Sequence, residues 1–266
     1  MTALRFLVFC NTMTFFKCAL HLERFPDMKN CYLLPWLVFA LVGSAAEEQE
    51  LAFLQASVAF DQALIPALVS TKSGRAETAI PAMDRLTEAW EVYKAEQAPT
   101  LTKASGWSLI RDGIDRRLTM AGRFVASSDI GMAHVLLEQV RADLIRIRQV
   151  LGRETFIDGL VAFHDRMEAA LLEGPPSLAE MDRNTLLSKV DALDAYWTEL
   201  EEDEFNADVF GYLWSDTSDL KRRLINQRRA IDALREAVAG GRLEDVDQLA
   251  AKVIKGFQRI YLSFGS

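Results

Sequence analysis

Apolar residues recur every three or four positions through most of the chain after residue 46. Two stretches show the pattern most clearly: Leu136, Val140, Leu144, Ile147 and Leu151 in one, and Val246, Leu249, Val253, Phe257, Ile260 and Phe264 in the other. This spacing places apolar side chains on one face of a helix and charged side chains on the opposite face. The pattern therefore predicts an all-α fold.

Gly, Pro and polar turn residues divide the apolar stripes into eight predicted helices. We expect them at about 47–70, 76–97, 105–127, 129–151, 153–173, 178–202, 207–239 and 242–264. Four amphipathic helices joined by short loops bury their stripes most simply as an antiparallel bundle. Between the fourth and fifth helices we expect a turn at Gly152 rather than one continuous helix, because Gly commonly ends a helix.

Short motifs recur in the same order in the two halves of the chain. Val58-Ala59-Phe60 matches Val161-Ala162-Phe163, Trp90 matches Trp197, Trp107 matches Trp214, and Arg116-Arg117-Leu118 matches Arg222-Arg223-Leu224. Such self-similarity is typical of a duplicated module. The sequence thus predicts two tandem antiparallel four-helix bundles from an internal duplication, at 47–152 and 153–266. We expect the four matched tryptophans to pack in the core, with ligand stacking as the alternative.

Residues 29–46 have the organisation of a secretory signal peptide. Lys29 supplies a positive start, residues 31–42 form a short apolar run, and Gly43-Ser44-Ala45-Ala46 offers small residues for cleavage. The run is short for a membrane span, which needs about 20 residues. We expect a natural start at Met28, with 1–27 as an upstream extension, and a periplasmic or secreted protein with no stable membrane span after cleavage.

The charge of the chain argues against a nucleic-acid partner. The formal net charge is −8, and the basic pairs such as Arg228-Arg229 lie in helical stretches rich in acids. Proteins that bind phosphate backbones usually carry a basic patch. We interpret these charges, and the acidic run 201–204, as solvated helix surfaces rather than as binding sites.

Few side chains after residue 46 are suited to covalent or thiolate chemistry. All three cysteines, Cys10, Cys18 and Cys31, precede it, and the only histidines beyond it are His134 and His164. No Gly-x-Ser-x-Gly turn or phosphate-binding loop is present. The sequence therefore gives no reason to expect an enzyme.

Each of the two histidines has a glutamate four residues later, which forms the pairs His134–Glu138 and His164–Glu168. That spacing puts both side chains on one helix face. With a turn at Gly152, the two pairs could face each other across neighbouring helices, and imidazole plus carboxylate suits zinc, copper or iron. The opposing interpretation is that these are surface histidines, since the duplication aligns them with Asp61 and Asp247.

Two functions remain in view. The first is an exported helical-bundle binding protein that binds a transition metal or a small cofactor in the cell envelope. The alternative is a cofactor-free protein-interaction or sensory module whose partner is another envelope protein.

Overall fold

The computed structural model describes residues 34–203 and 205–265, with side chains from residue 47 onward. Every regular element in these ranges is a helix, so the predicted all-α fold is confirmed. Residues 49–266 form one compact unit, which is described below. The predicted extension, Met28 and Lys29 lie outside the described residues.

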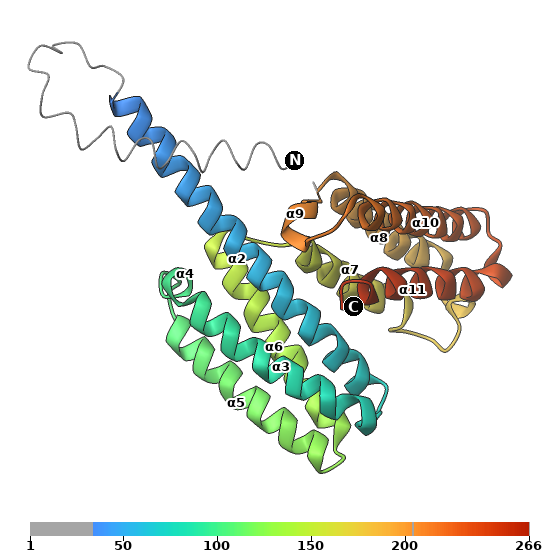
Figure 1. Ribbon diagram of the computed structural model, residues 1–266. Coiled ribbons are helices and arrows are strands. Elements are labelled where there is room, and N and C mark those ends of the chain that lie inside the picture. The colour runs from blue at the N-terminus through green and yellow to red at the C-terminus, as the bar shows by residue number, and fades with distance from the viewer. Residues whose placement is uncertain (1–33, 204, 266) are drawn as a thin grey trace, which may run out of the picture. The chain divides into compact units, whose positions relative to one another are not determined.

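The N-terminal helix group contains four long helices, which can be followed in Figure 1. They are α2 (Leu34–Lys72), α3 (Ala76–Glu96), α5 (Trp107–Ala126) and α6 (Ile130–Leu151), with the single turn α4 (Ala98–Leu101) between α3 and α5. Helix α5 packs against both α3 and α6. The ranges of α3, α5 and α6 agree with the predicted ones within two residues at each end.

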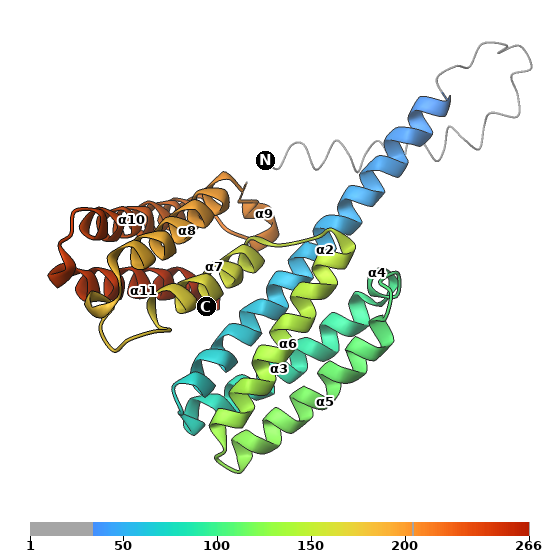
Figure 2. The ribbon, with the colours of Figure 1, turned by 180° about the vertical axis from the view of Figure 1, so that it is seen from behind.

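The C-terminal helix group also contains four long helices (Figure 2). They are α7 (Phe156–Leu171), α8 (Arg183–Glu202), α10 (Trp214–Ala239) and α11 (Val246–Leu262), and α10 packs against α8 and α11 while α7 packs against the same two. Short turns, η2 (Leu178–Glu180), α9 (Ala207–Phe210) and η3 (Leu243–Asp245), precede α8, α10 and α11. The predicted duplication stays a prediction.

These short turns correct three predicted helices, which were each expected to begin at the turn. Asp182 accepts a hydrogen bond from the Thr185 N–H and so starts α8 only at Arg183. Gly211 has a φ of 63° and ends α9, so the predicted helix 207–239 is broken before Trp214. The helical periodicity continued across both breaks, and this is why the sequence did not reveal them.

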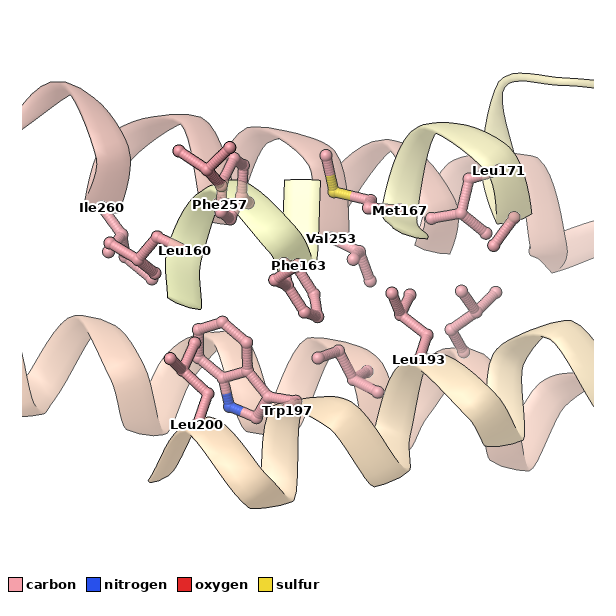
Figure 3. Packing of buried hydrophobic residues seen from close by; sticks show 14 of the residues in the cluster. Leu160, Phe163, Met167, Leu171, Leu193, Trp197, Leu200, Val253, Phe257 and Ile260 are labelled. Atoms are coloured by element: carbon pink, nitrogen blue, oxygen red, sulfur yellow. The ribbon is translucent and has the colours of Figure 1, made fainter. Parts of the chain in front are cut away.

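The apolar core consists of two clusters of buried side chains. One is made by α2, α3, α5 and α6, and includes Phe60, Leu86 and Trp90. The other is made by the C-terminal helix group. Figure 3 shows part of it, with Phe163 of α7 beside Trp197 of α8; their ring centroids lie 4.7 Å apart.

Helix α2 contributes to both clusters. Val58 and Ile65 pack into the second cluster, although most apolar side chains of α2 belong to the first. Glu47–Lys72 is also the one stretch of the described residues that is long and apolar enough to cross a membrane, and half of its apolar window is buried within the protein. Packing on two sides accounts for the apolar character of this helix. Since α2 begins at Leu34, the predicted start at residue 47 is wrong, and the predicted cleavage region lies within the helix.

Three of the four matched tryptophans are in the core as expected, but the fourth is not. Trp90, Trp107 and Trp197 are at most 6% exposed, whereas Trp214 is 85% exposed. Near the start of α10, the buried Phe210 and Phe264 and the partly buried Phe205 and Tyr212 pack their rings on one another. With that space filled, the first residue of α10 projects outward.

The turn predicted at Gly152 is confirmed. Helix α6 ends at Leu151, and Gly152 adopts the left-handed conformation that ends helices. Helix α7 then begins at Phe156, where Thr155 and Asp158 form a capping box. This cap brings the Asp158 carboxylate back beside the end of α6.

Candidate functional site

Each predicted histidine–glutamate pair is formed on its helix. On α6, His134 Nε2 lies 3.5 Å from Glu138 Oε1, and on α7, His164 Nε2 lies 3.3 Å from Glu168 Oε1. Both imidazoles are mostly buried, with about a fifth of each side chain exposed. The spacing of four residues therefore places each histidine beside its glutamate, as the sequence predicts.

Cationic side chains already occupy the carboxylates of both pairs. The Lys72 ammonium group, at the end of α2, lies 3.0 Å from Glu168 Oε1. The Arg141 guanidinium lies 2.5 Å from Glu138 Oε2 and 3.9 Å from Asp165 Oδ1. The two pairs thus belong to one mixed-charge network at the seam of α2, α6 and α7. Among the described residues, no three His, Cys, Asp or Glu side chains are grouped so that they could hold a metal ion.

Thr71 fixes the ring orientation of His134. Its hydroxyl lies 2.8 Å from the Ala67 carbonyl oxygen and 3.0 Å from that of Leu68, so its proton is donated to the backbone of α2. Its oxygen then accepts a hydrogen bond from His134 Nδ1, 3.2 Å away. Nε2 then faces the Glu138 carboxylate, 3.5 Å away, which favours the charged form of the imidazole. Burial lowers the pKa of His134, and Lys72 and Arg141 lower it further against the opposing effect of Glu138.

A second charged cluster, which sequence reasoning missed, lies at the same seam and is almost fully buried. Arg148 of α6 contacts Asp61 of α2 and Asp158 of α7, and the three side chains are 2%, 4% and 5% exposed. Arg148 Nε donates to Asp158 Oδ2 at 2.8 Å, and Nη2 donates to Oδ1 of the same carboxylate. Arg148 Nη1 lies 3.2 Å from Asp61 Oδ2. We call these three residues the junction triad.

The surroundings of the triad shift the pKa values of two of its members. Burial raises the pKa of Asp61 to about 6, against the lowering effect of Arg148. Burial alone would lower the pKa of Arg148, but the two carboxylates together hold it above its ordinary value. The sequence carried one signal for this cluster: Asp61 is the single charged residue between positions 51 and 71.

The most exposed apolar side chains with a common location are Leu213 and Trp214, at 71% and 85%. They lie at the start of α10, where the Asp216 carboxylate accepts a hydrogen bond from the Leu213 N–H at 3.0 Å. Three exposed carboxylates, Asp208, Asp216 and Asp219, occur within the same short stretch of chain. A surface hollow of about 440 Å³ next to it is lined by Tyr212, by Asp216 and other side chains of α10, and by Gln62 of α2. We call Leu213 and Trp214 the exposed pair.

Comparisons of this chain with protein-family models, with curated proteins and with solved structures find no match.

Proposed function

We propose that this protein is an exported helical module that binds another protein of the cell envelope through the exposed pair, in a role that is neither catalytic nor dependent on a cofactor. The observation that carries the proposal is the 85% exposure of Trp214 beside a 71% exposed Leu213. Tryptophan is enriched among the residues that dominate binding energy at protein interfaces.

The energetic argument rests on the size and rigidity of the pair. Covering a tryptophan side chain removes roughly 200 Å² from water, which at about 25 cal/mol per Å² favours binding by about 5 kcal/mol before ordering costs. Trp214 is already held at the start of a helix of 26 residues. A partner therefore has little backbone entropy to overcome at this position.

The charges beside the pair indicate the chemistry of the partner. Asp208 and Asp216 are exposed and acidic, whereas Asp219 is paired with Arg222, whose neighbours Lys221 and Arg223 are also basic. We therefore expect an apolar pocket whose rim carries charges of both signs, with basic groups opposite Asp208 and Asp216.

The test places a photo-crosslinking amino acid at position 214 of the full chain in the cells that produce it. Leu109 on α5 is 72% exposed and provides the matched control position. We expect a crosslinked product of one discrete mass from position 214 and none from 109, and loss of the product when Leu213 is changed to Asp. Equal products from both positions, or none from 214, would contradict the proposal.

Export is supported by the signal-like segment 29–46. Amino-terminal sequencing of the protein from the envelope fraction should give a chain that begins at Glu47. Detection of any peptide from residues 1–27 would also show that translation does not start at Met28.

A second candidate function is the binding of zinc, copper or iron by His134, Glu138, His164 and Glu168. The hydrogen bond from His134 Nδ1 to Thr71 supports it, because metal-binding histidines commonly donate their other ring N–H to a fixed acceptor. Metal would have to displace Lys72 and Arg141 from the carboxylates. In calorimetric titrations of the full chain, Lys72→Ala should then strengthen binding and His164→Ala should abolish it. Failure of all three metals to bind would remove this candidate.

A further inference from the structure

The junction triad holds two carboxylates and one guanidinium in an almost dry environment. With all three groups ionised, the cluster carries one negative charge, and each member is at most 5% exposed. A net charge is costly to bury, so a proton taken up by one carboxylate would make the cluster neutral. The geometry decides which carboxylate takes it.

Asp158 is well satisfied in its ionised form. It accepts two hydrogen bonds from Arg148, one from the Thr155 N–H at 2.9 Å, and one from the Thr155 hydroxyl at 3.3 Å. Hydrogen bonds to the charged form of a carboxylate favour that form. The Thr155 bonds also belong to the cap of α7, where the helix dipole favours a negative group.

Asp61 is poorly satisfied by comparison. Its Oδ2 atom is 3.2 Å from Arg148 Nη1, but the approach is not aligned as a hydrogen bond, and both atoms are buried without another hydrogen-bond partner. Titratable or charged groups approach Asp61 from four other helices. They are Tyr93 on α3, Arg141 and Arg148 on α6, Asp158 on α7 and Tyr261 on α11. The cations favour ionisation of Asp61, whereas burial and the Asp158 charge oppose it.

We propose that Asp61 is a proton-operated latch at the seam of α2, α6 and α7: its protonation in mildly acidic conditions neutralises the junction triad and tightens the attachment of α7. The position of the triad supports this role. Arg148 is the last buried residue of α6 before the turn, Asp158 lies in the first turn of α7, and Asp61 lies on the helix that contributes to both core clusters.

The direction of the effect follows from proton linkage. The pKa of Asp61 is about 6 in the folded protein and 3.8 as the ordinary value. Between these values the folded state binds more protons than the unfolded state, so the stabilisation from Asp61 grows as pH falls through 6 and is lost as pH rises through it. Between pH 7.5 and pH 5, this group alone should lower the unfolding equilibrium constant about tenfold.

Other titratable groups, such as His134, also contribute to the pH dependence of stability, so the test compares variants. Asp61→Asn keeps the shape of the protonated side chain but cannot titrate, and Asp84→Asn changes an exposed aspartate on α3 as the matched control. Urea unfolding of the full chain, followed by circular dichroism from pH 5 to 7.5, gives the ratio of unfolding constants for each variant and the wild type. We expect that ratio to change about tenfold with pH for Asp61→Asn and not at all for Asp84→Asn. Parallel pH profiles for the wild type and Asp61→Asn would overturn the proposal.

Two measurements on the wild-type chain make the test independent of variant folding. Carbon-13 spectra of labelled aspartate should show one carboxyl that titrates near pH 6, and its assignment to any residue other than Asp61 would overturn the proposal. Hydrogen exchange, corrected for the intrinsic pH dependence, should show greater protection of amides in 153–161 at pH 5 than at pH 7.5, with α10 amides as the internal reference. Equal changes in both segments would show a uniform stability effect and would refute the latch.

Discussion

Removing the guanidinium of Arg148 should expose the energetic role of the junction triad more directly than any other single change. Arg148→Met keeps a long, flexible side chain of high helix propensity but removes the one cation that Asp61 and Asp158 share. Breaking a buried ion pair by removing one partner costs about 3–5 kcal/mol. Because Arg148 is shared by two carboxylates and is fully buried, we expect a loss within that range at pH 7.5.

The measurement is urea unfolding of the full chain followed by far-ultraviolet circular dichroism. Arg146→Met is the matched control, because Arg146 lies two residues earlier on the same helix and is exposed, and it should change the free energy of unfolding by no more than about 0.5 kcal/mol. Adding Asp61→Asn to Arg148→Met should recover part of the loss, since one of the two unpaired charges is then gone. The reasoning is refuted if Arg148→Met costs no more than Arg146→Met, or if Asp61→Asn brings no recovery.

Four further single substitutions test local features of the fold by the same unfolding assay. Gly256→Ala would place a Cβ 2.2 Å from the buried Gln227 Oε1, so we expect the free energy of unfolding to fall by about 1–3 kcal/mol, and by less when Gln227 is also changed to Leu. An unchanged urea midpoint for Gly256→Ala would contradict this contact. Phe163→Ala empties a fully buried site beside Trp197 and should cost about 3–5 kcal/mol, a result that a loss below 1 kcal/mol would exclude. Gly152→Ala puts a residue with a Cβ at a backbone φ of 63° and should lower the free energy of unfolding by about 1 kcal/mol. Gly122→Ala, in open space within α5, should raise it by up to about 1 kcal/mol, and the opposite order would be inconsistent with the backbone described.

The helices were predictable because their signal is local. A residue such as Leu144 or Phe257 is buried on the face that its spacing from neighbouring apolar residues defines, and both are at most 1% exposed. The turn at Gly152 was predictable for the same reason, since a helix stop needs only a residue that tolerates a positive φ. Local signals of this kind do not depend on what the rest of the chain does.

The exposure of Trp214 was not predictable from the same signals. Its match with Trp107 favoured a core position, and Trp107 is indeed buried against Trp90. Whether a tryptophan is buried depends on which other side chains fill the neighbouring core in the folded structure. Here Phe210 and Phe264 pack together, with ring centroids 5.3 Å apart, and the chain turns at Gly211 before α10 begins. Two matched residues can therefore be identical in type and differ in burial. The exposure of Trp214 is the difference that supports its role as a binding residue.

The charged clusters also could not be predicted from local sequence signals alone. The sequence favoured His134 and His164 because histidine is rare in this chain, yet Lys72 and Arg141 also contact the carboxylates of that network. Asp61 entered the sequence analysis only as the counterpart of a histidine, although one charge in an otherwise uncharged helical stretch must be paired, protonated or exposed. Its partner could not be found from spacing, because Arg148 lies on the last turn of α6 and meets Asp61 only through the packing of α2 on that helix. A lone carboxylate in an apolar helix thus predicts that a site exists, while the tertiary fold determines what the site contains and how readily it takes up a proton.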